Sequence, residues 1–267
     1  MTLLAMTRII AITNQKGGSG KTTTAVNLAA ALGEQGRRIL LIDLDPQASA
    51  STWYGIKSQG KGLYEVFTNS GTISELVRQS EVARVEIIPS SSWLNGIEKV
   101  LAGEVGTETI LRQSLSQLQN RWDYILLDCS PALNIVTVNA LVAAGEVIVP
   151  VESHVLALGG LAQLLGTVQT VKARLNAELE ISGILACRVV SRTRHSQEVI
   201  EQLRTRFGNQ MYQAIIHESV RLAECPSFEK PITEYDPNGR GAKDYRLLAQ
   251  EVMAQELSTK AEIRQGA

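Results

Sequence analysis

The feature that most constrains this chain is a glycine-rich segment at residues 14–24, NQKGGSGKTTT, which joins an apolar run to a helical pattern. The run at 8–14 is strand-like, and residues 21–35 carry apolar side chains at helical spacing. Gly17, Gly18 and Gly20 have no side chains, so backbone N–H groups there can surround an anion at the start of the helix. The segment therefore predicts an α/β fold with an anion site at the carboxyl end of its first strand.

Short runs rich in Ile, Leu and Val alternate with helical patterns along the chain, which is typical of parallel strands joined by crossover helices. The expected strands are 8–14, 38–43, 85–89, 124–128, 146–151, 181–190, 213–217 and 232–235. The expected helices are 21–35, 107–119, 134–144, 158–176, 197–207 and 242–258. Right-handed crossovers would wind the strands into one mostly parallel, twisted sheet with helices on both faces.

Length and composition favour a single domain over residues 1–267. Seven residues precede the first expected strand, so we expect no N-terminal helix-turn-helix domain. The apolar runs are strand-sized and no secretory leader is evident, which predicts a cytoplasmic protein without a membrane span. Widely separated cysteines predict small buried side chains rather than disulfides or a zinc site, and the scattered histidines predict structural or exposed roles; these residues are Cys129, Cys187, Cys225, His154, His195 and His217.

Three aspartates follow apolar strands at the sheet edge where the glycine-rich segment lies. Asp43 and Asp45 end the run ILLIDLD and fall on the same side of the chain, and Asp128 ends YILLD. Each alone would serve as a turn or capping carboxylate. Together, beside the glycine-rich segment, they favour a nucleotide site.

Phosphoryl transfer requires a phosphate cradle, a metal ion and a positioned water rather than a nucleophilic side chain. Lys21 is placed to pair with the β- and γ-phosphates, and the Thr22 hydroxyl is placed to ligate Mg²⁺. We therefore expect ATP and Mg²⁺ as the ligands.

The strict phosphate-loop pattern fails, because Gln15 stands where its first glycine should be. KGGSGKTT instead resembles the deviant Walker A motif of the family that contains ParA, Soj, MinD and the nitrogenase iron proteins, with Lys16 as its additional lysine. The resemblance implies a P-loop NTPase that forms an ATP-sandwich homodimer, in which Lys16 reaches the partner subunit's nucleotide.

The resemblance also assigns roles to individual residues. It implies that Lys16, Lys21 and Asp45 are catalytic, with Asp45 orienting the attacking water. Thr22, Asp43 and Asp128 would hold or support the metal ion. The family often has Pro-Arg-Asn near the adenine, and His217 and Ser219 stand at the outer positions of that triplet here. The implied ATP-binding residues are Lys16, Gly17, Gly18, Ser19, Gly20, Lys21, Thr22, Thr23, His217 and Ser219.

A basic segment lies in the C-terminal third, although the net charge of the whole chain is −1. Residues 188–206 contain five arginines, at 188, 192, 194, 204 and 206, against two glutamates. Charge alone fits a solvated helix face as well as a DNA surface. The stretches SRTRHSQEVIEQLRTRFG and VRLAECPSFEKPITEYD resemble Soj-type proteins, which implies that Arg192 and Arg221 bind DNA phosphates without reading bases. A wider surface would include Lys230, Arg240, Lys243 and Arg246.

The resemblance implies a nucleoid-associated ATPase that binds nonspecific DNA as an ATP dimer. A ParB-like protein or a cargo adaptor would stimulate its slow hydrolysis and release it. The cargo would be a chromosome, a plasmid or a protein assembly such as a carboxysome or a chemoreceptor cluster.

Three alternatives share this phosphate loop. A MinD-like membrane switch needs a basic amphipathic C-terminal helix, which LAQEVMAQELSTKAEIRQGA does not resemble. Iron–sulfur carriers need paired cysteines, and this chain has no C-x-x-C. A cobyrinate amidase needs a further small-molecule site, for which the sequence shows no signal.

Overall fold

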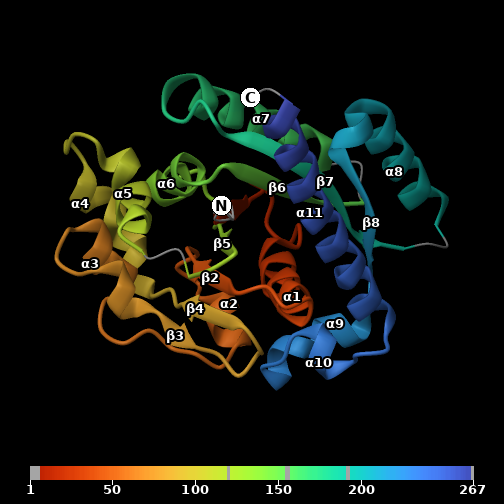
Figure 1. Cartoon of the computed structure of the whole chain (residues 1–267), viewed down its shortest axis with the longest axis horizontal. Coiled ribbons are helices and arrows are strands. Elements are labelled where there is room, and N and C mark those ends of the chain that lie inside the picture. The colour runs from red at the N-terminus through yellow and green to blue at the C-terminus, as the bar shows by residue number, and fades with distance from the viewer. Residues whose placement is uncertain (1–6, 119–120, 154–156, 191–192, 266–267) are drawn as a thin grey trace.

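The computed structural model describes residues 7–118, 121–153, 157–190 and 193–265. Within these residues eight strands form one sheet in the order β3-β4-β2-β5-β1-β6-β7-β8 (Figure 1). They are β1 Arg8–Ile12, β2 Ile39–Asp43, β3 Arg78–Gln79, β4 Val85–Ile88, β5 Tyr124–Asp128, β6 Glu146–Glu152, β7 Glu180–Val189 and β8 Met211–His217. The two-residue edge strand β3 is antiparallel to β4, and the other pairs are parallel. The expected mostly parallel sheet is confirmed.

Helices cover both faces of this sheet, as the sequence predicts (Figure 1). They are α1 Lys21–Glu34, α2 Ser49–Trp53, α3 Leu63–Phe67, α4 Ile97–Leu101, α5 Ile110–Ser116, α6 Ile135–Ala143, α7 Ala157–Arg174, α8 Arg194–Phe207, α9 Val220–Glu224, α10 Ile232–Tyr235 and α11 Arg240–Gln265. Helices α3 to α8 cover one face, and α1, α2, α10 and α11 cover the other. None of the helices in the described ranges combines the length and apolar character needed to cross a bilayer.

Alternation along the strands produces two separate cores. Ile10 and Ile12 of β1 face the core under α1 and α11, whereas Ala11 between them faces the core under α6 and α7. Strands β2 and β5 alternate in the same way, and all their residues are buried. Because both sheet faces are covered, the central strands are continuously apolar, and polar groups collect at their carboxyl ends.

One expected strand, residues 232–235, is wrong: this segment is the short helix α10. Pro231 precedes it at φ −67°, a value suited to a helix start, and the Glu234 N–H donates to the Pro231 carbonyl at 3.0 Å. The Ile232 N–H donates to the Asn27 Oδ1 atom of α1 at 2.7 Å. The β-branched run misled the prediction because tertiary contacts, not the intrinsic propensity of four residues, decide its conformation.

The expected helix at 107–119 is also shorter than predicted. Residues Thr107–Thr109 form a 3-10 turn, and α5 occupies Ile110–Ser116. Residue 119 lies outside the described residues. In contrast, α8 begins three residues earlier than expected, because the Thr193 side chain caps its first turn by accepting from the Ser196 N–H.

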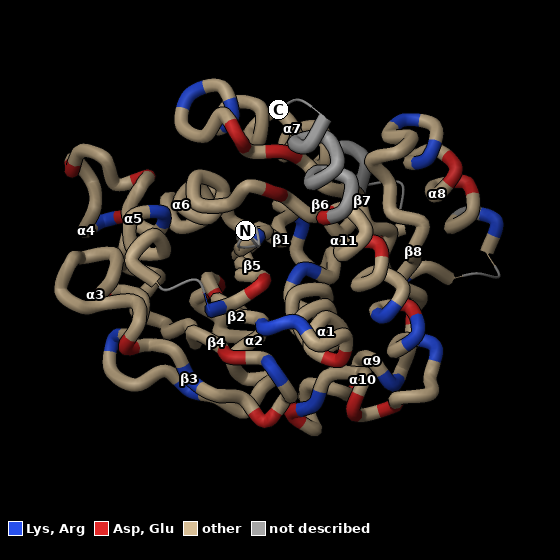
Figure 2. Tube along the Cα trace, in the orientation of Figure 1, with Lys and Arg blue, Asp and Glu red and all other residues tan. Residues whose placement is uncertain are grey.

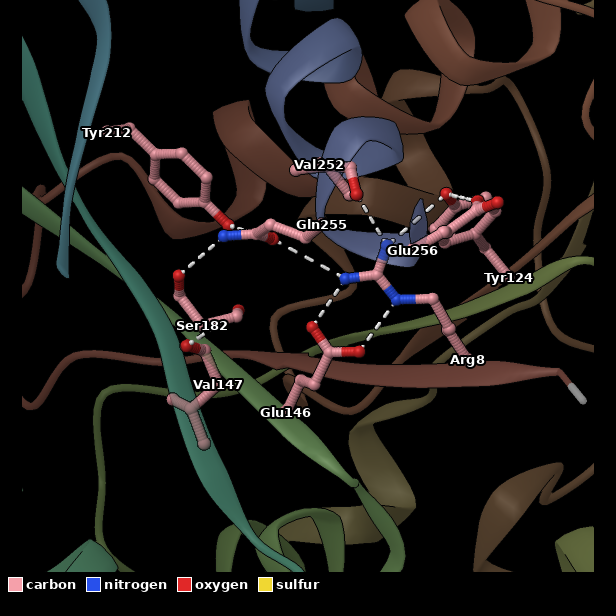
Figure 3. A network of polar contacts seen from close by, with 9 residues as sticks. All are labelled: Arg8, Tyr124, Glu146, Val147, Ser182, Tyr212, Val252, Gln255 and Glu256. Carbon is pink, nitrogen blue, oxygen red and sulfur yellow. Dashed lines mark hydrogen bonds and ion pairs between the residues drawn. The ribbon is translucent and has the colours of Figure 1, made fainter. Parts of the chain in front are cut away.

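A polar network fastens α11 to the amino-terminal edge of the sheet (Figure 3). Arg8 at the start of β1 donates through Nε and Nη2 to both carboxylate oxygens of Glu146, at 2.7 and 2.6 Å. Its Nη1 donates to the Val252 carbonyl of α11. The Tyr124 hydroxyl binds Glu256 on the same helix. Arg8 therefore connects β1, β6 and α11 at the edge opposite the glycine-rich segment.

Arg8→Met should lower the free energy of unfolding by about 3 kcal/mol, because Glu146 keeps its charge in a largely enclosed site without its partner. Arg38→Met is the matched control: Arg38 pairs with Asp123 but is half exposed, so its loss should lower the free energy of unfolding much less than the loss of Arg8. Urea titration of both variants measures the difference. Equal losses would show that the Arg8 network adds nothing beyond an ordinary surface pair.

Candidate active site

The glycine-rich segment connects β1 to α1 and is attached to the neighbouring strand β6. The buried Asn14 side chain donates to the Pro150 carbonyl at 2.7 Å and accepts from the Lys16 N–H at 3.0 Å. Gly20 precedes α1 at φ 94°, and Cys187 would lie 3.4 Å from a Cβ placed there. The backbone angle, in the left-handed region, favours glycine at this position.

A cleft of about 720 Å³ opens at the carboxyl edge of the sheet. One side is formed by the glycine-rich segment and the start of α1, and the other by the ends of β7 and β8 and by α9. The predicted residues that line it are Gly17, Gly18, Gly20, Lys21, Thr22, Thr23, Asp45, His217 and Ser219. The structure thus brings together positions about 200 residues apart in the sequence.

Lys21 is almost completely buried, with 6% of its surface exposed. Its ammonium group donates to the Lys16 carbonyl at 3.1 Å, which holds the loop against the helix start. Burial lowers the pKa of Lys21, while the nearby carboxylates of Asp128 and Asp45 act in the opposite direction. Together with the α1 N-terminus, this amine makes the cleft floor favourable for phosphate oxygens.

Asp43 and Asp128 lie next to each other, paired in register at the ends of β2 and β5. Asp43 accepts hydrogen bonds from the Ser51 N–H at 2.8 Å and the Ser51 hydroxyl at 2.6 Å. Among the described residues, neither carboxylate oxygen of the fully buried Asp128 has a hydrogen-bond partner within 3.5 Å, although the Thr22 hydroxyl is near enough to oppose the rise in its pKa. Burial raises the pKa of Asp43 to about 6 and that of Asp128 well above its usual range, and the Asp43 charge adds to the effect on Asp128.

This pair fits a site that gains a cation together with its ligand. No group of three or more His, Cys, Asp or Glu side chains in the described ranges is arranged to hold a metal ion by itself. Mg²⁺ keeps several waters and commonly takes phosphate oxygens among its ligands. The protein would therefore need to supply only a few groups, such as the Asp43 and Asp128 carboxylates and the Thr22 hydroxyl. The Ser19 hydroxyl in the loop is also buried, and it has no hydrogen-bond partner among the described residues.

The opposite wall of the cleft is formed by the segment that follows β8. His217 Nδ1 lies 2.9 Å from the Asp244 carboxylate of α11, and the His217 N–H donates to the same oxygen at 3.0 Å. The Ser219 hydroxyl caps α9 by accepting from the Leu222 N–H. Both residues line the cleft, and both are already tied to local structure.

Three residues with a place in this site were not predicted from the sequence. Ser51 holds Asp43 in position, and its hydroxyl also accepts from the Ser90 N–H at 3.0 Å. Glu152 and Arg188 form an ion pair of 3.2 Å beside the cleft. The sequence offered one indication that Glu152 and Arg188 belong to the site: each is a charged residue near the carboxyl end of a buried strand.

Of the two predicted DNA-binding positions, Arg192 and Arg221, only Arg221 belongs to the described residues. Arg221 on α9 is exposed and pairs with Glu224 at 3.1 Å, whereas Arg192 lies outside the described residues. Figure 2 shows positive charge at both ends of α8 with negative charge between, and further positive residues around α9 and the start of α11. The exposed cations there are Arg194, Arg204, Arg206, Lys230, Arg240 and Lys243.

Two of the expected surface cations belong elsewhere. Arg188 lies in β7 at the cleft, paired with Glu152 and Glu218, so it is not part of the α8 surface. Arg246 binds Glu34 on α1 at 2.7 Å and holds α11 against α1. The basic surface is therefore smaller than the sequence suggests, because tertiary pairing neutralises part of the charge.

Comparison with known proteins gives the same picture along the whole chain. Residues 7–181 match the family described as AAA domain. Sporulation initiation inhibitor protein Soj of Bacillus subtilis is 41% identical over 251 residues, which cover 93% of this chain and 99% of that protein. Chromosome partitioning protein ParA of Myxococcus xanthus is 42% identical over 248 residues, with 92% and 88% covered.

Solved structures give the same fold. A structure of cobyrinic acid a,c-diamide synthase from Mycobacterium smegmatis has a TM-score of 0.81 and 32% identity, covering 93% of this chain and 94% of that one. A second structure of it, with a bound ATP analogue and magnesium, has a TM-score of 0.76 over 88% and 98% of the two chains.

The sheet, the glycine-rich loop and the aspartates at neighbouring strand ends define a P-loop ATPase. With full-length identities near 40%, the chain belongs to the ParA/Soj family of chromosome-partitioning ATPases.

In protein free of nucleotide and magnesium, Asp128→Asn should raise the melting temperature at pH 8, by about 2–4 °C for each kcal/mol of burial cost removed, because burial of the charged carboxylate raises its pKa well above the usual range. The folded-state pKa is raised, so the penalty is present at high pH and disappears as the wild-type carboxyl is protonated. The gain should therefore shrink between pH 8 and pH 5. Calorimetry across this range measures it.

Asp123→Asn is the control for this experiment. Asp123 accepts hydrogen bonds from the Arg38 N–H and guanidinium, so its replacement should lower the melting temperature at pH 8. If Asp128→Asn behaved like Asp123→Asn, burial of Asp128 would not be the dominant effect on its ionisation.

Proposed function

We propose that this ATPase is a nucleotide-controlled DNA-binding switch. It dimerises around ATP, holds nonspecific duplex DNA in that state, and is released when a partner protein stimulates slow hydrolysis. The observation that supports this most strongly is the cleft that joins the phosphate loop, Asp45 and the segment after β8, in a chain about 40% identical to Soj and ParA over more than 90% of its length.

ATP and Mg²⁺ are the proposed ligands, and the ATP analogue and magnesium in the structural relative support them. Lys21 and the backbone of residues 16–23 would bind the phosphates, and Thr22, Asp43 and Asp128 would hold the metal ion and its waters. Mg²⁺, when bound, neutralises charge on the phosphate oxygens. His217 and Ser219, across the cleft, are the residues proposed to lie near the base.

Asp45 is the residue proposed to orient the attacking water. It follows β2 at the cleft, where one of its carboxylate oxygens accepts from the Gln47 N–H at 2.9 Å. Hydrolysis by this arrangement depends on positioning and electrostatics rather than on covalent chemistry. Lys16, with about a third of its side chain exposed (34%), would complete the site of the partner subunit in a homodimer.

The proposed DNA surface comprises Arg221 and the exposed cations of α8 and α11. Because the net charge is −1, attraction to DNA must be local, and pairing two subunits doubles the number of phosphate contacts. Such binding would place the protein on the nucleoid in the cytoplasm. The partner would be a ParB-like protein or a cargo adaptor, and the cargo a chromosome, a plasmid or a protein assembly.

The name of the structural relative raises a different possibility, amidation of a corrinoid precursor. The three cysteines are buried, and burial raises the pKa of each thiol, so none is a ready nucleophile. The higher identities to Soj and ParA favour partition.

The deciding experiment compares binding of the purified protein to nonspecific duplex DNA at low salt with ATP, ADP or no nucleotide, with anionic lipid vesicles as a second surface. ATP-dependent DNA binding would support the proposed switch. Binding to lipid alone would favour a MinD-like membrane cycle, and binding to neither surface would favour a metabolic role.

Asp45→Ala should keep ATP binding and ATP-dependent DNA binding but lose about 100-fold in hydrolysis rate, because the attacking water is no longer positioned. Phosphate release and DNA affinity, measured on the same preparation, separate the two effects. Lys21→Ala should instead lose nucleotide binding. Normal turnover in Asp45→Ala would assign the water to another residue.

Arg221→Glu should reduce DNA affinity at least about tenfold and lower the slope of log affinity against log salt by about one per subunit, while ATP binding stays intact. Lys99→Glu is a charge-matched control, because Lys99 is exposed on α4, far from α9 (Figure 1). Fluorescence anisotropy with labelled duplex DNA measures both variants. Equal losses would indicate a general charge effect and place the DNA surface elsewhere.

A further inference from the structure

Four charged residues beside the cleft form a chain of ion pairs, and the roles described so far do not account for this pairing. The Lys16 ammonium donates to Glu152 Oε2 at 2.9 Å. Arg188 binds the other oxygen, Glu152 Oε1, at 3.2 Å, and reaches Glu218 at 3.7 Å. One carboxylate therefore holds two cations, and one of them is the lysine proposed to act in the partner subunit.

The backbone around this cluster is firmly placed. Glu152 is the last residue of β6, and Ser153 after it donates through N to the Cys187 carbonyl at 3.0 Å and through its hydroxyl to the Arg188 carbonyl at 3.1 Å. Arg188 has φ 52°, in the left-handed region that residues with a side chain seldom adopt, beside a register irregularity between β7 and β8. Such strained positions occur preferentially at functional sites.

We propose that Glu152 is a positioning residue that retains Lys16 in its own subunit, and that Arg188 sets the strength of this retention by competing for the same carboxylate. The inference rests on the proposed dimer, in which Lys16 contacts the nucleotide of the other subunit. Lys16 cannot hold Glu152 and a phosphate of the partner's nucleotide at once. Each dimerisation event must therefore break two such ion pairs, one per subunit.

Arg188 lowers the electrostatic cost of releasing Lys16. When Lys16 leaves, Glu152 keeps the Arg188 guanidinium as its partner, so no carboxylate remains uncompensated beside the cleft. Lys16 and Glu152 are partly exposed, so in each subunit their ion pair favours the retained position of Lys16 over the released position by about threefold. Because a dimer contains two copies, the effect on the dimerisation constant is about tenfold.

Glu152→Gln should therefore strengthen ATP-dependent dimerisation about tenfold, and Arg188→Met should weaken it. In the Glu152→Gln background, Arg188→Met should have no further effect, because the carboxylate for which the two cations compete is gone. Analytical ultracentrifugation with ATP, with Asp45→Ala present throughout to prevent turnover, measures these constants. Glu180→Gln, the same charge change at the opposite end of the sheet, should leave the constant unchanged.

A second measurement needs no dimer. The rate at which an amine-acylating reagent modifies Lys16 in nucleotide-free protein should rise in Glu152→Gln and fall in Arg188→Met. Unchanged Lys16 labelling in both variants would overturn the retention of Lys16 by Glu152 whatever the dimer does. Altered labelling with unchanged dimerisation would overturn the link to assembly. A wild-type chain that never dimerises with ATP, while Lys16 labelling responds as expected, would instead overturn the proposed function and with it that link.

Discussion

Two buried carboxylates, Asp43 and Asp128, set the main constraint on this structure. They lie side by side at the ends of neighbouring strands, and burial raises the pKa of both, with the Asp43 charge adding to the effect on Asp128. Ser51 compensates Asp43 through two hydrogen bonds, and the largely buried Lys21 offsets part of the charge. The rest of the fold must offset this cost. The proposed binding of a nucleotide and its cation would stabilise the folded state by mass action.

The helix α11 links the two ends of the sheet. At the cleft, its Asp244 holds His217 through both the ring and the backbone N–H. At the opposite edge, its Val252 and Glu256 join the network around Arg8 and Tyr124 (Figure 3). One rigid helix thus fixes the wall of the cleft to the amino-terminal ends of β1 and β5. Interactions at the sheet edge opposite the cleft therefore help to position the segment after β8.

Charged residues that are clustered in the sequence are separated in the structure by the ion pairs they form. Arg188 and Arg246 fall within basic stretches, yet one lies at the cleft with Glu152 and Glu218 and the other binds Glu34. Lys16, expected to act across a dimer, is bound within its own subunit. A count of charges along the chain therefore overestimates the basic surface and misses the acid that retains Lys16.

The sequence by itself determined the class of fold, the phosphate loop and the strand-end aspartates, because these depend on local patterns: buried runs with period-two alternation, glycines before a helix, and acids where strands end. Only the tertiary structure decided that residues 232–235 form a helix, that Ser51 supports Asp43, and that Glu152 and Arg188 meet beside Lys16. Ser51 and Asp43 are only eight residues apart, but the other two features depend on contacts between residues far apart in the chain. The strand order and the packing of α11 set those contacts, and neither leaves a pattern in the sequence of the segments that meet.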